Sequence, residues 1–220
     1  MITIPEKKEN IAVIRWILGF FVGTLFAAPV LAQSPEMAPD ALVKKVTEDV
    51  LVIVRSDKDI RAGNRKKIID LVETKVLPYF DFNRMTRLAM GKNWRQADPQ
   101  QQQMLVNEFR TLLVNTYASA FTTYKDQTVE VKPLRMEPGD TEAVVGTVVN
   151  QSNGQPPVAI DYNMEKTDSG WKVYDFTVEG VRLVQNYRNT FNTEVQNGGI
   201  DRLIKTLQDK NNSLAQASSR

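Results

Sequence analysis

Residues 157–191 constrain the fold most strongly, because they encode two strands and a helix with almost no linker between them. Apolar and polar side chains alternate strictly in 158–165, which is typical of a strand with one apolar face. The run 171–178 follows a turn and is apolar on both faces, so we expect it inside the sheet with apolar neighbours on each side. Alternation predicts these two faces as Trp171 and Val173 on one side, and Tyr174, Phe176 and Val178 on the other.

The N-terminal residues 1–32 have the pattern of a secretory signal peptide. Three basic residues precede an apolar core at 16–28, and the segment ends in Val-Leu-Ala, which signal peptidase accepts. We therefore predict export to the periplasm, with cleavage after Ala32. An uncleaved membrane anchor is the alternative, because the apolar run at 11–32 approaches the roughly 20 residues that span a bilayer.

The chain contains neither histidine nor cysteine. The lack of histidine removes His-based catalytic triads and nearly every zinc site, and the lack of cysteine removes disulfides and a lipoprotein anchor. Basic residues number 28 against 26 acidic ones, so no basic excess indicates nucleic-acid binding. The part from residue 33 on is long enough for one domain with a sizeable core.

Four helices are predicted in the first half of the mature chain. The first begins at Pro39, and the second ends before Pro78, because a residue that precedes proline is pushed out of the α region. The third is short and ends at Gly91. The fourth begins at Asp98-Pro99, where a capping residue precedes a proline at the first helical position.

Four strands follow, and their short links imply antiparallel neighbours. They are predicted at 128–136, 141–150, 158–165 and 171–178, and C-terminal helices with a break at Gly198-Gly199 come after them. We therefore predict an α+β fold, in which an antiparallel sheet of about four to five strands packs against a helical subdomain. The predicted domain covers 33–211 (33–125 mainly helical, 126–180 sheet, 181–211 C-terminal helices), with a flexible tail at 212–220.

Two aspartates on adjacent predicted strands are the candidates for catalysis. Asp161 and Asp175 could act as a hydrolase or isomerase pair if either pointed inward beside Tyr162 or Tyr174. Alternation instead places Asp161 opposite Tyr162, on a face that we expect to be wet. Two groups of basic residues could attract phosphate head groups, although a solvated face is the simpler interpretation; they are Arg61, Arg65, Lys66 and Lys67, and Arg182 with Arg188.

Several segments together resemble one known family. The sequence GWKVYDFTVEGVRL at 170–183, followed by Tyr187-Arg188 and Phe191, resembles the signature of the MlaC family of periplasmic phospholipid-binding proteins, also called the toluene-tolerance family. The sequences DF at 81–82, MGKNW at 90–94 and FRTLLVNTY at 109–117 match the same pattern in the same order. One departure is Arg182, where the family has a small polar residue, and it should alter the local surface rather than the fold.

The resemblance implies a monomeric carrier and not an enzyme. Its sheet would resemble nuclear transport factor 2, with phospholipid acyl chains held between that sheet and the helical subdomain. In this family, lipid moves between an outer-membrane lipoprotein associated with a porin and an inner-membrane ABC transporter with an MCE-domain subunit, which keeps phospholipid out of the outer leaflet. The resemblance implies no nucleic-acid partner, no metal and no cofactor, with phospholipid as cargo.

We predict a lipid cavity lined by strands 158–164 and 171–178 on one side and by helices 79–90 and 98–124 on the other. No catalytic or metal-ligating residue is predicted. The predicted lipid-binding residues are Phe82, Met85, Leu88, Leu105, Phe109, Leu112, Tyr117, Val131, Val145, Ile160, Tyr162, Met164, Val173, Tyr174, Phe176 and Tyr187. A periplasmic adaptor with a solid core, which binds only proteins, is a further alternative.

Overall fold

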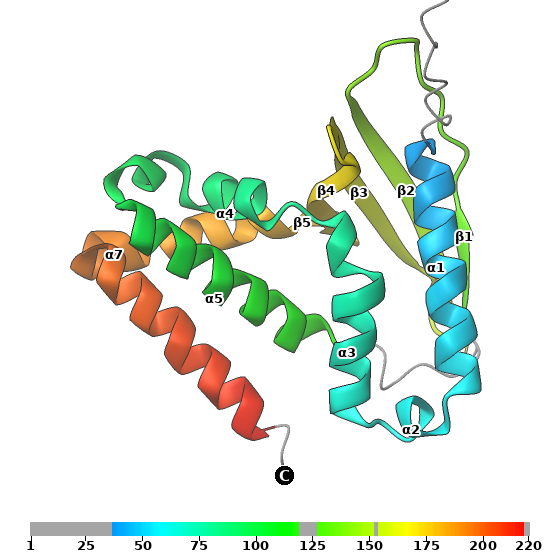
Figure 1. The fold of residues 1–220 in the computed structure, drawn as a ribbon, viewed down its shortest axis with the longest axis horizontal. Coiled ribbons are helices and arrows are strands. Elements are labelled where there is room, and N and C mark those ends of the chain that lie inside the picture. The colour runs from blue at the N-terminus through cyan, green and yellow to red at the C-terminus, as the bar shows by residue number, and fades with distance from the viewer. Residues whose placement is uncertain (1–36, 119–126, 152–153, 218–220) are drawn as a thin grey trace, which may run out of the picture. The chain divides into compact units, whose positions relative to one another are not determined.

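The computed structural model describes residues 37–118, 127–151 and 154–217, which lie in one compact unit, Glu36–Arg220. The predicted signal peptide and its cleavage site lie outside the described residues, and so does the predicted change from helices to strands near 125. The fold is α+β, as the sequence predicts, with a five-stranded sheet and helices (Figure 1). No helix in the described ranges is long and apolar enough to cross a membrane.

The sheet is antiparallel throughout, and its strands follow chain order from β1 to β5. The first strand is shorter than predicted, because Pro133 has no N–H to continue the ladder beyond Lys132. A short fifth strand was not predicted individually. The strands are β1 (Thr128–Val131), β2 (Glu142–Asn150), β3 (Val158–Thr167), β4 (Gly170–Val178) and β5 (Val181–Arg182).

A β-bulge in β4 changes which of its side chains share a face. Met164 of β3 pairs with Val173, but Asn163 pairs with Asp175, so Tyr174 is the extra residue. The predicted division of faces is therefore wrong for Phe176 and Val178. The bulge returns Phe176 and Val178 to the face that carries Trp171 and Val173, because directly paired residues point to the same side of a sheet.

The N-terminal helices join the sheet to the rest of the fold. They are α1 (Pro39–Ser56), α2 (Lys58–Arg61) and α3 (Arg65–Lys75), followed by the 3₁₀ turn η2 (Leu77–Tyr79). The first half of α1 packs on the sheet through Val43, whereas its second half packs on α2 and α3 through Val50 and Val54. One long amphipathic helix thus contributes to two hydrophobic clusters.

The middle helices begin and end at the signals in the sequence. The helix α4 (Phe82–Met90) is capped by the Asp81 carboxylate and ends at Gly91, whose φ of +55° suits glycine. The 3₁₀ helix η3 (Gly91–Gln96) leads to α5 (Pro99–Tyr117), where Asp98 and Gln101 form a capping box.

The C-terminal helix α7 (Leu183–Ala217) is kinked at Gly198 and Gly199. Gly199 has a φ of +78°, a conformation in which L-residues with a side chain are strained, so the glycine pair separates two helical halves as predicted. Helix continues to Ala217, so the predicted flexible tail begins too early at 212. Figure 1 shows α7 alongside α5 and α4, and side chains of these three helices form one hydrophobic cluster.

Candidate functional site

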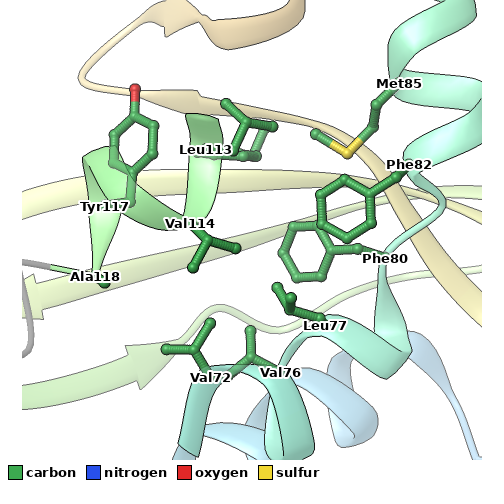
Figure 2. Close-up of a pocket in the computed structure, with 11 residues that line it drawn as sticks. Val72, Val76, Leu77, Phe80, Phe82, Met85, Leu113, Val114, Tyr117 and Ala118 are labelled. Carbon is green, nitrogen blue, oxygen red and sulfur yellow. The ribbon is translucent and has the colours of Figure 1, made fainter. Parts of the chain in front are cut away.

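An apolar cavity of about 110 Å³ lies where α3, η2, α4, α5 and β4 meet. In Figure 2, side chains from the two sides of the cavity point toward one another. Its lining consists of Val72, Val76, Leu77, Phe80, Phe82, Met85, Leu113, Val114, Tyr117, Ala118 and Phe176. The hydroxyl of Tyr117 is the one polar side-chain group among these lining residues. Such a lining suits hydrocarbon and offers nothing to hold a metal ion.

The wall formed by residues 78–82 is attached to the edge of β4. Phe80 forms a parallel bridge with Val173, and the Asp81 N–H donates to the Val173 carbonyl at 2.9 Å. The Lys172 ammonium donates to the Pro78 carbonyl at 2.7 Å. The Asp81–Val173 bond lies on the β4 edge outside the segment that pairs with β5, and the ring of Phe80 faces the cavity (Figure 2).

Arg84 fastens α4 to the same sheet. Its guanidinium pairs with Glu165 of β3 and, at 2.8 Å, with Glu142 of β2. The guanidinium carbon also lies 3.6 Å from the centroid of the Tyr174 ring, which the bulge in β4 presents to it. Because Phe82 and Met85 lie on the same short helix, this network holds two lining residues in place.

The helix α5 is buried on two sides. Leu113, Val114, Tyr117 and Ala118 line the cavity. Leu105, Phe109 and Leu112 pack in the cluster that α5 forms with α7, which Leu113 also joins. The Phe109 ring lies 4.9 Å from the Tyr187 ring and 5.0 Å from the Phe191 ring, in edge-to-face contacts. The interface with α7 therefore fixes the rotation of α5 about its axis, and with it the side chains that face the cavity.

Aromatic rings connect the cavity walls. Tyr117 of α5 meets Phe176 of β4 edge to face at 5.8 Å, and Phe176 meets Phe80 in the same way at 6.3 Å. Phe80 stacks on Phe82 at 5.9 Å. Burial raises the pKa of the Tyr117 hydroxyl above its ordinary value, so the group stays neutral at physiological pH.

Two polar contacts join α3 to α5 beside the cavity. The Arg110 guanidinium pairs with the Glu73 carboxylate at 3.1 Å, and Arg65 donates to the Asn115 side-chain oxygen at 2.7 Å. The Arg110 guanidinium carbon also lies 5.9 Å from the ring centroid of Phe82, a lining residue. Arg110 and Glu73 are both partly exposed, with side-chain accessibilities of 36% and 43%.

The structure brings four of the predicted site residues together at the cavity, namely Phe82, Met85, Tyr117 and Phe176. The others do not line it. Leu88, Leu105, Phe109, Leu112 and Tyr187 pack in the cluster of α4, α5 and α7, and Val131, Val145, Tyr162, Met164 and Val173 pack in the cluster that α1 covers. Ile160 is half-buried on the sheet face of Tyr162, and Tyr174 lies against Arg84.

This cavity covers less of the sheet than the predicted lipid cavity, and α1 packs on part of the remaining face. Val43 of α1 occupies the face of Val145 and Met164. The lining residues that the prediction missed are Val72, Val76, Leu77, Phe80, Leu113, Val114 and Ala118. The run Leu112-Leu113-Val114 was the available signal, since three adjacent apolar residues on a helix exceed one stripe and indicate two buried sides.

The aspartates considered for catalysis lie on the other face of the sheet from Tyr162 and Phe176. Asp161 is paired with Thr177, and Asp175 with Asn163. The buried Asp175 carboxylate accepts bonds from Arg182 at 3.0 and 3.1 Å and from the Val184 N–H at 3.1 Å. Asp175 therefore anchors the start of α7, and its carboxylate is occupied by Arg182 and the Val184 N–H rather than placed beside Tyr162.

Several of the basic side chains considered for phosphate binding form ion pairs with acidic residues. Lys66 pairs with Asp70, Lys67 with Asp57 and Asp59, and Arg182 with Asp175. The guanidinium of Arg188 lies against Gly91, where an added Cβ would come within 2.9 Å of its Nε atom. No cluster of acidic side chains suited to a metal ion occurs in the ranges that the structure describes.

Comparisons with known proteins find relatives of this chain in sequence and in structure. A phospholipid-binding protein from Ralstonia solanacearum, solved in complex with a phospholipid, is 42% identical, with a TM-score of 0.76 over 81% of this chain and 99% of that one. The toluene tolerance protein ttg2D of Pseudomonas putida is 26% identical, and 88% of each chain is covered. The intermembrane phospholipid transport system binding protein MlaC of Haemophilus influenzae is 22% identical over 92% of this chain and 93% of that protein.

The family model for the MlaC protein matches residues 44–209. This match covers most of the chain, including every helix and strand of the cavity wall. The chain therefore belongs to the MlaC family.

Proposed function

We propose that this protein is a phospholipid carrier that holds acyl chains in the cavity between α3, α4, α5 and β4. The observation that carries the proposal is the lining, in which one hydroxyl is the only polar side-chain group among the lining residues. The similarity to a solved phospholipid complex at 42% identity supports it. The lining offers no nucleophile beside a base, so we propose binding and transport rather than catalysis.

Physical chemistry explains why a lipid needs such a carrier. The two acyl chains of a phospholipid contain about 30 methylenes in total. At about 0.8 kcal/mol per methylene, the free energy of transferring them out of water is favourable by on the order of 24 kcal/mol. An unaccompanied lipid therefore crosses an aqueous compartment too slowly to be useful. Transfer from a bilayer into an apolar cavity is nearly neutral for the same chains, so a carrier can both load and release its cargo.

The cavity must enlarge to hold a whole acyl chain. Its volume is about 110 Å³, whereas an apolar protein cavity of about 150 Å³ holds one benzene molecule. We propose that the wall of α3 moves away from α5 on loading, because the described polar bonds that join these helices there involve partly exposed side chains. Side-chain rotation of Phe82 and Met85 would add to the volume.

The setting of the carrier follows from the export pattern and the family. We propose that the mature protein works in the periplasm and exchanges lipid with an outer-membrane lipoprotein complex and an inner-membrane ABC transporter with an MCE-domain subunit. Its role there would be to keep phospholipid out of the outer leaflet. The name of the Haemophilus influenzae relative, an intermembrane phospholipid transport protein, supports this assignment.

Native mass spectrometry of protein purified from the periplasm tests the proposal. We expect a mass increment of one or more phospholipids, lost after extraction with organic solvent and identified in the extract. The intact mass of the extracted protein also tests cleavage after Ala32. A protein that carries no lipid, and takes up none from phospholipid vesicles, would contradict the carrier function and favour the adaptor.

A further inference from the structure

Arg110 continues the stripe of α5 that lines the cavity. It precedes Leu113 and Val114 by three and four residues, so the three side chains lie on one face of the helix, one turn apart. Its guanidinium carbon is 5.9 Å from the ring centroid of Phe82 on α4. With 36% of its side chain accessible, Arg110 lies where the apolar lining meets solvent.

A phospholipid in this cavity must leave its phosphate at such a boundary. The lining offers no charge to pair with a phosphodiester, and an unpaired buried anion is costly. A guanidinium has five N–H donors in a planar fork that fits phosphate oxygens. The pair with Glu73 uses Nη2 at 3.1 Å, and one carboxylate does not use all five donors.

We propose that Arg110 binds the phosphodiester of the lipid whose acyl chains fill the cavity, and that the phosphate replaces Glu73 as its partner when the lipid is bound. This inference rests on the proposed carrier function and adds a chemical preference to it. The site would favour two-chain lipids that carry a phosphate over diacylglycerol. It would not distinguish one phospholipid head group from another, because all of them share the phosphodiester.

Two substitutions separate phosphate binding from a structural ion pair. Arg110→Gln and Glu73→Gln break the same contact between α3 and α5, but only the first removes the guanidinium. Glu73→Gln also removes a negative charge near the phosphate, so it should preserve or raise phospholipid affinity. Arg202→Gln is a matched control, because Arg202 pairs with Glu194 at the same distance of 3.1 Å on α7, outside the cavity lining.

The experiment measures binding of dioctanoyl phosphatidylglycerol and dioctanoylglycerol to delipidated full-length mature protein by calorimetry. We expect Arg110→Gln to weaken phosphatidylglycerol binding about tenfold, as for one lost charge-assisted hydrogen bond, and to change dioctanoylglycerol binding less than about twofold. Arg110→Lys should recover part of the loss, and Arg202→Gln should match the wild type.

Each other outcome overturns a stated part of the account. Equal losses of phosphatidylglycerol affinity in Arg110→Gln and Glu73→Gln would show that the two residues form only a structural ion pair. Equal losses of affinity for phosphatidylglycerol and dioctanoylglycerol would show that Arg110 affects binding of the acyl chains and not of the phosphate. If the wild type binds inorganic phosphate tightly without lipid, and Arg110→Gln abolishes that binding, the residue forms a free-phosphate site instead. Failure of the wild type to bind either lipid would contradict the carrier function itself.

Discussion

Single residues decide where the cavity lies and what it can hold. Val114 and Leu112 are two positions apart on α5, yet Val114 lines the cavity and Leu112 packs in the cluster with α7. Both side chains are buried, but only the packing partner of each face assigns its role. A carboxylate at Val114 would therefore test the site, whereas one at Leu112 would test the fold.

Val114→Asp should abolish lipid copurification. A carboxylate in this lining would lie beside the hydrocarbon of the cargo, which is costly, and would compete for Arg110 one turn before it on α5. We expect lipid occupancy in native mass spectra to fall by more than about tenfold, as for a cost above 1.4 kcal/mol. Val52→Asp on the exposed face of α1, where Val52 is 65% accessible, is the control and should keep its lipid. A folded Val114→Asp variant with normal lipid occupancy would show that this cavity does not hold the lipid.

Ionisation of the Tyr162 hydroxyl should lower the stability of the fold at high pH. Burial raises the pKa of its hydroxyl above the ordinary value of 10.0, and a hydrogen bond with Thr147 offsets this only in part. The folded state favours the neutral hydroxyl. Its contribution to the free energy of unfolding is therefore complete below the pKa that Tyr162 has in the unfolded chain, and it is lost as pH rises through the pKa that Tyr162 has in the folded protein. Thermal unfolding followed from pH 8 to pH 12 should show the decrease above about pH 10, and Tyr162→Phe should reduce it. An unchanged pH profile in that variant would show that other groups cause the decrease.

At the scale of elements, the contacts that fasten α4 matter most for the site. Arg84→Gln would remove two ion pairs and the contact with Tyr174. Since 18% of the Arg84 side chain is accessible, we expect a loss of about 2 kcal/mol in the free energy of unfolding, and faster release of lipid.

Urea unfolding and the rate of lipid release to acceptor vesicles measure these two effects of Arg84→Gln. The control Arg202→Gln removes a more exposed pair, with 52% of the Arg202 side chain accessible, and should cost less than about 1 kcal/mol. Equal release rates for Arg84→Gln and the wild type would show that Arg84 stabilises the fold without positioning the cavity wall.

The sequence predicted most elements because their signals are local. The capping box at Asp98, the stop at Gly91 and the break at Gly198-Gly199 act within a few residues of themselves. The bulge at Tyr174 has no such signal, since it reflects pairing with β3. The cover that α1 provides over Val145 is also a long-range contact, so no local signal in the sequence shows it.

At the scale of the whole molecule, lipid should act as part of the folded structure. A ligand that binds only the folded state stabilises it by about 2.7 kcal/mol at a hundredfold excess over its dissociation constant. For a domain of this size we expect Tm to fall by about 5 to 10 °C on delipidation. Differential scanning calorimetry before extraction, after it and after reloading from vesicles measures the change. Identical melting in all three samples would contradict a cargo buried in the cavity.

Photocrosslinking from a bound lipid shows where its acyl chains lie. Protein loaded with a phospholipid that carries a diazirine near the middle of one acyl chain would be irradiated, digested and analysed by mass spectrometry. We expect crosslinks in the cavity lining, chiefly at Val72, Phe82 and Val114. Crosslinks concentrated instead at Val144, which is exposed on the other face of the sheet, or within the α5–α7 cluster around Phe109, would contradict this expectation.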